Sequence, residues 1–286
     1  MTGPASGSPA SSDDPAPVRY DPSWLRLREP ADARARSREL AALAASELGG
    51  AARVVLHDLG CGTGSMARWL APLLPGPQHW VLHDRDPDLL ALATASMPRH
   101  AADGAPVTAE ARRGDLTRLT AADLDAASLV TASALLDVLT AAEVDALVDA
   151  CSARACPALL TLSVIGRVEL TPADPLDAAV GAAFDAHQRR SIGDRALLGP
   201  DAVAVAAAGF RRRGARVDVR ASPWRLRPGP ADAALTGEWL RGWVGAAREH
   251  DPGLASDGYL ARRLAAVQTG TLAAAVHHED VLVRWG

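Results

Sequence analysis

Short apolar runs alternate with helix-like segments along most of the chain. The clearest run is RVVLHD at 53–58, and similar runs predict further strands at 79–84, 107–112, 128–133 and 158–165. The segments between them carry helix-start signals, such as Thr120-Ala-Ala-Asp123 and Thr140-Ala-Ala-Glu143. Strand and helix in regular succession predict a parallel sheet joined by right-handed crossovers.

The flanking segments add helices to this alternation. Residues 31–48 predict one helix, which Gly49 and Gly50 end. Thr171-Pro-Ala-Asp174 predicts an extra helix over about 171–192, directly after the fifth strand. The remaining pattern predicts helices at 63–74, from Pro87, from Pro200, at 231–249 and at 259–267, a strand at 215–220, and a final strand or hairpin at 271–284.

The same pattern divides the chain into parts. Residues 1–19 are rich in Ser, Pro, Ala and Asp and are expected to form a disordered tail rather than a signal peptide. Residues 20–50 are expected to form a helical lid segment. The main domain is expected over 51–286, with the inserted helix at about 171–192 and a helical segment at about 230–268.

Composition narrows the function classes. The 286 residues are 48% hydrophobic, which suffices for one large α/β domain. The net charge of -4 provides no global positive field, which argues against nucleic acid as a partner. No stretch approaches the roughly 20 apolar residues of a membrane span. The three cysteines cannot pair completely and no spacing resembles a metal site, so we expect reduced thiols and a cytoplasmic location.

A glycine-rich loop follows the first predicted strand. Asp58-Leu-Gly-Cys-Gly-Thr-Gly64 lies between a strand and a helix, where glycines let the backbone approach a ligand and the helix N-terminus offers free amides. A dinucleotide loop needs a third glycine at residue 65 or 67, but these are Ser65 and Ala67. Asp84, about 20 residues further on, fits a carboxylate that binds ribose hydroxyls.

The loop and three acids together resemble the class I S-adenosylmethionine-dependent methyltransferases. Their first motif is an acid followed by G-x-G-x-G, met here by Asp58, Gly60, Gly62 and Gly64. An acid ending the second strand is met by Asp84, and an acid after the third strand by Asp115. The resemblance covers residues 53–165 well and the flanks in outline.

This resemblance implies a Rossmann-like, doubly wound, mostly parallel seven-stranded sheet with an antiparallel last strand and added lid helices. It also implies that Asp58 and the loop hold the methionyl end of S-adenosylmethionine, that Asp84 binds the ribose hydroxyls, and that Asp115 accepts from the adenine amino group. The complete set expected to bind this cofactor is Asp58, Gly60, Cys61, Gly62, Gly64, Asp84, Arg85, Asp115, Leu116 and Ser133.

The acceptor site is less clearly marked. Candidates for catalysis are Asp137, after the fourth strand, and His187, on an apolar helix stripe where packing is the commoner role for histidine. Substrate contacts are expected from Tyr20, Trp24 and Arg167, although aromatic residues such as the first two also anchor chain ends. The segment with Arg28, Arg34, Arg36 and Arg38 offers ligands for a carboxylate or a solvated helix face.

Methyl transfer to a small-molecule acceptor is the leading hypothesis. The fourth strand ends in Ser133-Ala-Leu-Leu136, which lacks the Asn/Asp-Pro-Pro-aromatic signature of enzymes that methylate nucleic-acid bases. The alternatives are an RNA or protein methyltransferase, an NAD-dependent oxidoreductase, and a methyltransferase-like binding module without catalysis. The acceptor atom, the pathway and the oligomeric state stay open.

Overall fold

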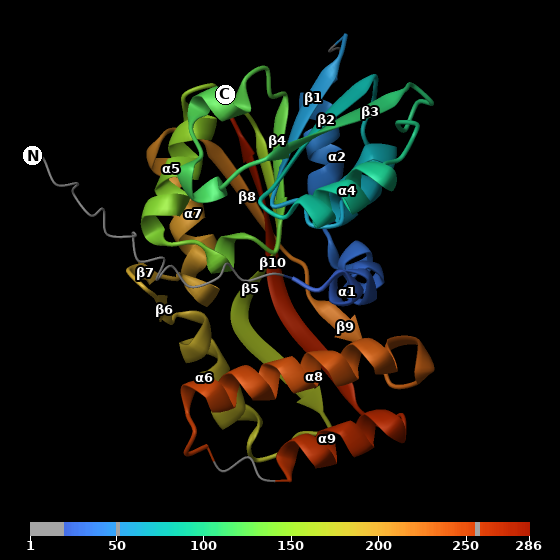
Figure 1. Cartoon of the computed structure of the whole chain (residues 1–286), viewed down its shortest axis with the longest axis vertical. Coiled ribbons are helices and arrows are strands. Elements are labelled where there is room, and N and C mark those ends of the chain that lie inside the picture. Colours follow the sequence, from blue (N-terminus) through green and yellow to red (C-terminus); the bar gives the residue numbers. More distant parts are fainter. Residues whose placement is uncertain (1–19, 50–51, 255–257) are drawn as a thin grey trace, which may run out of the picture.

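The computed structural model describes residues 20–49, 52–254 and 258–286, and the predicted tail over 1–19 lies outside this range. Its main sheet has the strand order β3-β2-β1-β4-β5-β10-β8, with β9 paired to β10. Strands β1 to β5 run parallel, and β10 is antiparallel to β5, β8 and β9 (Figure 1). The strands are β1 Val54–Leu59, β2 Gln78–Asp84, β3 Val107–Arg113, β4 Leu129–Ser133, β5 Ala158–Thr171, β8 Arg216–Ala221, β9 Trp224–Leu226 and β10 Ala273–Arg284.

Helices cover both faces of this sheet. One apolar core lies between β4, β5 and β10 and the helices α5 (Ala141–Ser152) and α7 (Ala202–Arg212). The other core lies under α2 (Arg38–Glu47), α3 (Ser65–Leu70) and α4 (Pro87–Ala95). This three-layer arrangement confirms the predicted α/β fold and leaves the carboxyl ends of the parallel strands free of both helix layers.

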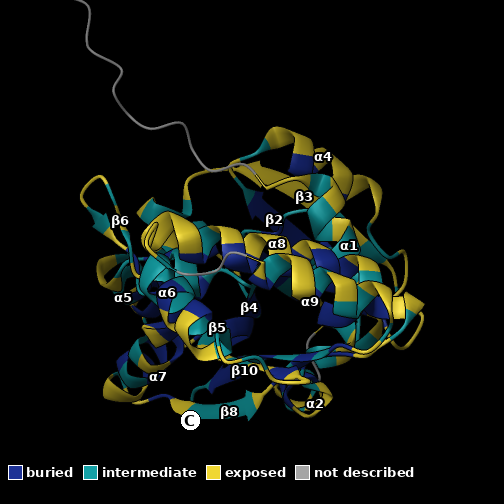
Figure 2. Ribbon diagram, turned by 90° about the horizontal axis from the view of Figure 1, so that it is seen from below, coloured by how far each residue is buried: buried dark blue, intermediate teal, exposed yellow. Residues whose placement is uncertain are grey.

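A helical body lies beyond the carboxyl ends of the parallel strands (Figures 1 and 2). The lower halves of β5 and β10 extend into it and pack against α1 (Pro22–Ala35), α6 (Asp177–Gln188), α8 (Pro230–His250) and α9 (Tyr259–Gln268). Its core is aromatic: Trp239 stacks on Trp243, and Trp243 contacts Tyr259. Within the described residues, no helix is both long and apolar enough to cross a membrane.

The buried carboxylate of Asp280 ties the helical body to the sheet. Its oxygens accept the backbone N–H groups of Ser37 and Leu162 over 2.7 and 2.8 Å, and the hydroxyl of Ser222 over 2.6 Å. Leu162 has φ +56°, so this bond holds a left-handed bend in the middle of β5. Burial raises the pKa of Asp280 above its ordinary value.

The structure corrects several predicted boundaries. The helix predicted over 31–48 is two helices, α1 and α2, because Ser37 accepts the N–H of Leu40 and thereby caps a new helix. Thr171 ends β5 instead of beginning a helix, and α6 begins at Asp177. Residues 121–124 form only a 3₁₀ turn. In the described part the sheet has eight strands rather than seven, because the short β9 pairs with β10.

Two further short strands were not predicted. β6 (Ser191–Ile192) and β7 (Arg195–Ala196) form a small hairpin after α6. Besides the 3₁₀ turn at 121–124, the described residues contain four other 3₁₀ helices in the connections. These are η1 (Ala71–Leu73), η2 (Leu116–Arg118), η4 (Leu136–Val138) and η5 (Gly199–Asp201). Such two-residue strands and single turns carry no hydrophobic period that a sequence pattern could reveal.

Candidate functional site

The glycine loop lies at the carboxyl end of β1, as predicted. Gly60, Gly62 and Gly64 have φ values of +65°, +54° and +84°, which only glycine adopts readily. The Gly62 N–H donates to a carboxylate oxygen of Asp84 over 2.9 Å, so the loop is fixed to the end of β2. Cys61 is buried in this loop, and burial raises the pKa of its thiol, which therefore stays protonated.

Asp58 is a buried carboxylate with one oxygen unpartnered. Its Oδ1 accepts the Thr131 hydroxyl over 2.7 Å, whereas its Oδ2 is buried without a hydrogen-bond partner among the described residues. Burial raises the pKa of Asp58 to about 7, against the lowering effects of Thr131 and the Arg36 guanidinium. Near neutral pH a cation placed beside Asp58 would therefore favour its ionised form.

The other two acids of the motif stand at the ends of the next strands. Asp84 ends β2, and its second oxygen accepts the Asp86 N–H over 3.0 Å. Asp115 follows β3, is exposed, and accepts the Thr117 N–H over 3.0 Å. The hydrogen bonds from Thr117 hold the pKa of Asp115 below its ordinary value against the opposing effect of burial, so Asp115 is ionised at neutral pH. Arg85 and Leu116 each follow one of these acids directly in sequence.

Arg36 differs from the other arginines of its segment because its side chain is buried next to the glycine loop. Its side chain donates to the hydroxyls of Ser65 and Ser133 over 3.1 and 3.0 Å, between α3 and the end of β4. Only 3% of Arg36 is exposed, and its Nε has no hydrogen-bond partner among the described residues. Ser65 is the residue that breaks the dinucleotide pattern, and here it accepts from a guanidinium group.

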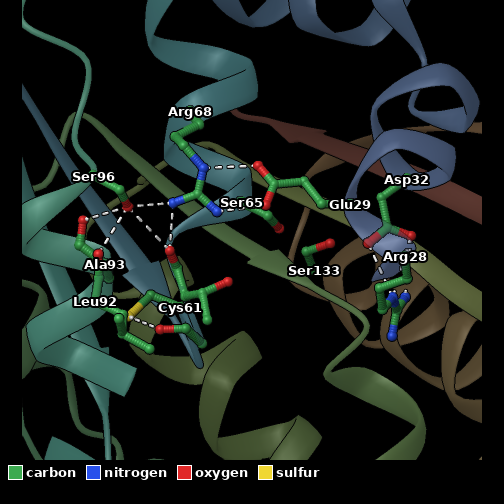
Figure 3. Close-up of polar contacts among 12 residues, drawn as sticks. Arg28, Glu29, Asp32, Cys61, Ser65, Arg68, Leu92, Ala93, Ser96 and Ser133 are labelled. Carbon is green, nitrogen blue, oxygen red and sulfur yellow. Dashed lines mark hydrogen bonds and ion pairs between the residues drawn. The ribbon is translucent and has the colours of Figure 1, made fainter. Parts of the chain in front are cut away.

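Helix α1 covers the glycine loop. A Leu25 methyl carbon lies 3.3 Å from the point that a Cβ on Gly62 would occupy. The Glu29 carboxylate accepts two hydrogen bonds from Arg68 over 2.7 and 2.6 Å, and Arg68 also contacts Ser96 of α4 (Figure 3). This ion pair clamps α1 onto α3, and the sequence pattern did not reveal it because its two residues are far apart in the chain.

Of the acceptor candidates, Tyr20 and Asp137 come together. Tyr20 is 45% exposed as a residue, but burial of its hydroxyl end raises its pKa, and the nearby carboxylate of Asp137 raises it further, while Arg28, Arg85 and Arg190 act in the opposite direction. Asp137 follows β4 in η4, and its Oδ1 is buried without a hydrogen-bond partner among the described residues. Burial raises its pKa as well.

The other three candidates lie in different surroundings. Trp24 packs edge-on against Trp224 with ring centroids 6.5 Å apart, which makes it part of the helical body's core. His187 lies with Nε2 3.3 Å from Glu249 of α8 and Nδ1 3.2 Å from Arg190, and this geometry favours the packing role over catalysis. Arg167 pairs with Glu169 on the exposed lower part of β5, six residues along the strand from Thr161, the residue paired with Ser133.

His57 and His83 precede the first two acids and form a buried pair. His57 Nδ1 lies 3.0 Å from His83 Nε2, and the two rings stack. Burial lowers the pKa of both rings, that of His83 to about 4, so both are neutral at physiological pH. The pair is a packing feature of the strands.

Residues 56–157 match a family model described as a methyltransferase domain. No curated protein matches the chain in sequence. Among solved structures it is similar to the cyclopropane synthase MmaA2 from Mycobacterium tuberculosis, with 13% identity over 93% of this chain and 94% of that chain and a TM-score of 0.47. It is also similar to magnesium protoporphyrin IX methyltransferase from Synechocystis PCC 6803, with 12% identity, coverage of 91% and 92%, and a TM-score of 0.45.

These structural likenesses are too distant to transfer a substrate to this chain. The family match is the stronger evidence, because it runs from within β1 to the residue before β5 and contains the glycine loop and all three acids. Residues 56–157 therefore form a methyltransferase domain.

Proposed function

We propose that the methyl donor, S-adenosylmethionine, binds along the carboxyl ends of β1 to β4. We also propose that the methyl acceptor is a small molecule held under the helical body. The observation that carries the donor position is the pair of unpartnered buried atoms Asp58 Oδ2 and Arg36 Nε, which belong to two groups that interact electrostatically. The methionyl end of the donor has an ammonium and a carboxylate group. It therefore offers one partner of the right charge to each atom.

The remaining donor contacts follow the order of the strands. Asp84 takes the ribose hydroxyls and Asp115 the adenine amino group, with Arg85, Leu116, Cys61 and Ser133 completing the walls. Leu116 and Leu135 methyl carbons lie 3.6 and 3.2 Å from the position that a Cβ on Gly60 would occupy, so both side chains pack beside the glycine loop. When bound, S-adenosylmethionine supplies an electrophilic methyl group on its sulfonium sulfur.

Asp137 is the proposed general base. The carboxylate accepts a proton from an acceptor hydroxyl or amine while the acceptor atom forms its bond to the methyl carbon and the bond from that carbon to sulfur breaks. Its raised pKa brings it closer to neutrality, where a base transfers protons most efficiently. Tyr20 lies beside it and is suited to orient the acceptor through its hydroxyl. His187 and Trp24 pack within the helical body and Arg167 is exposed on β5, so none of the three is assigned to proton transfer.

Two features support a small acceptor. The helical body lies across the carboxyl ends of the strands, and α1 is clamped to α3, so the space near the donor is covered on this side. The net charge of -4 works against holding the phosphate backbone of RNA. Residues 20–50 and the helical insertions at about 171–192 and 230–268 thus act as one lid on the 51–286 domain.

A labelling experiment tests this proposal. The purified protein is incubated with S-adenosylmethionine that carries a radiolabelled methyl group and, in parallel, with the small-molecule filtrate, the RNA and the protein fraction of a cell extract. We expect label in the filtrate only, and loss of at least about 100-fold of that activity in Asp137→Asn with unchanged donor binding. Label in the RNA or protein fraction would overturn the small-molecule assignment.

A further inference from the structure

An arginine-lined cavity lies between the end of α1 and the segment that joins β8 to β9. Its volume is about 320 Å³, and it is lined by Ala31, Arg34, Ala35, Ala221, Pro223, Arg225 and Arg227. This volume lies within the range of roughly 300–1,000 Å³ that is typical of ligand sites. In Figure 1, α1 and β9 lie side by side, and their contacts agree.

The charge of this cavity is unbalanced. Arg34 is paired with Asp232 over 2.7 Å, so its charge is largely compensated. The guanidinium groups of Arg225 and Arg227 have no acidic partner within the described ranges 20–49, 52–254 and 258–286. None of the lining residues is an acid. Two uncompensated positive charges therefore line one cavity in a chain whose net charge is -4.

The walls of the cavity are held in place by buried contacts. Asp232 is 7% exposed and accepts both the Arg34 side chain and the Arg227 backbone N–H, the latter over 3.0 Å. Trp224 and Leu226, which flank Arg225, are buried, and β9 is paired with β10. Arg34 and Arg225 therefore extend from anchored backbone, which lowers the entropy cost of binding a ligand.

We propose that this cavity binds a compact small molecule with at least two negative charges, such as a phosphorylated or polycarboxylated metabolite. Guanidinium groups bind phosphate and carboxylate oxygens through paired hydrogen bonds, and an anion here would satisfy Arg225 and Arg227 together. A cavity of this size accommodates a single compact anion, whereas nucleic acid binding needs an extended basic surface. The proposal does not depend on the identity of the methyl acceptor.

The test is calorimetric titration of the full chain with pyrophosphate, with citrate and with a short single-stranded RNA. The test variant is Arg225→Gln/Arg227→Gln. The matched control is Arg211→Gln/Arg216→Gln, which removes two exposed arginines from α7 and β8 and keeps the same net charge. We expect pyrophosphate or citrate to bind one per chain, with affinity lowered at least about tenfold in the test variant and within about twofold in the control. The stronger ligand identifies the phosphate or carboxylate class.

Three results would overturn the proposal. The first is no binding of either anion to the parent at millimolar concentration, and the second is an equal loss of affinity in both double variants, which would indicate unspecific attraction. The third is RNA binding that is tighter than either anion and lost in Arg225→Gln/Arg227→Gln, which would assign the patch to nucleic acid. Circular dichroism and melting temperature of both variants show whether the fold is intact.

Discussion

The guanidinium group of Arg36 donates to the hydroxyl of Ser133 over 3.0 Å, so the end of α1 meets the end of β4 next to the glycine loop. The contact brings together the lid segment and the strand edge that are 97 residues apart in the chain. It also places one guanidinium charge where the carboxylate of the methionyl group is proposed to lie.

Arg36→Ala is expected to weaken donor binding by about 10- to 100-fold, because a hydrogen bond to a charged group is lost in a buried place. The matched control is Arg38→Ala, two residues further on and exposed, which should leave the dissociation constant unchanged. Calorimetric titration with S-adenosylmethionine measures both. Equal dissociation constants in the folded Arg36→Ala variant and the parent would remove Arg36 from the donor site.

Donor affinity should fall as the pH falls below 7. Burial raises the pKa of Asp58 to about 7, and the protonated carboxyl no longer attracts the donor ammonium group. Affinity is expected to drop about tenfold between pH 8 and pH 6, since one pH unit below its pKa about a tenth of the group is ionised. Asp58→Asn should bind weakly at both values. A flat profile in the parent would contradict this role.

The stability of the donor-free protein should move in the opposite direction with pH. Because the folded-state pKa of Asp58 lies above the ordinary value of 3.8, its ionisation costs the folded state free energy as the pH rises from about 4 through 7. Asp58→Asn should therefore raise the melting temperature more at pH 8 than at pH 5. Thermal melts at both pH values test this and separate weak donor binding at pH 6 from partial unfolding.

Asp280→Ala is expected to lower the free energy of unfolding by at least about 3 kcal/mol, because two buried donors, from Leu162 and Ser222, and the partly buried N–H of Ser37 lose their acceptor. The neighbouring change Glu279→Ala serves as control and should cost less than about 1 kcal/mol. Urea unfolding followed by fluorescence provides the comparison. A loss below about 1 kcal/mol for Asp280→Ala would show that β5 and α2 are positioned by other contacts.

Breaking the ion pair between Glu29 and Arg68 should loosen α1. Both side chains are about one quarter exposed, so the pair contributes modestly, and Glu29→Gln should speed amide exchange in α1 by about two- to fivefold. Glu238→Gln, which removes an exposed partner of Arg241 on α8, is the control. Exchange rates in α1 that match the parent would show that Leu25 and the neighbouring contacts hold this helix without the clamp.

The central part of the fold follows from local sequence. Strands β1 to β4 were predicted to within a residue or two, because each is a short segment bounded by turns or a helix signal. The capping box at Thr140 begins α5 as predicted. The break between α1 and α2 was missed, although Ser37 caps α2 by accepting the N–H of Leu40, because this cap lies inside one long helix-like pattern. The contact that fixes the Ser37 N–H comes from Asp280 at the far end of the chain, which no local pattern contains.

Some residues of the candidate site could likewise be predicted from local sequence, and others could not. Asp58, Asp84 and Asp115 could be placed from sequence, because each lies within two residues of the carboxyl end of a strand of the parallel sheet. Choosing Arg36 from four arginines required the path of α1, since only the fold shows which of them is buried beside Ser65 and Ser133. His187 could not be placed either, because its contact with Glu249 joins two helices far apart in sequence.

The most direct test of the central claim is parallel calorimetric titration of the protein and of Asp84→Asn with S-adenosylmethionine, S-adenosylhomocysteine and NADH. We predict that the parent binds the first two at one per chain and does not bind NADH, and that Asp84→Asn binds both at least about tenfold more weakly. Binding of NADH alone, or equal binding of S-adenosylmethionine by the parent and the folded Asp84→Asn variant, would contradict the donor site described here.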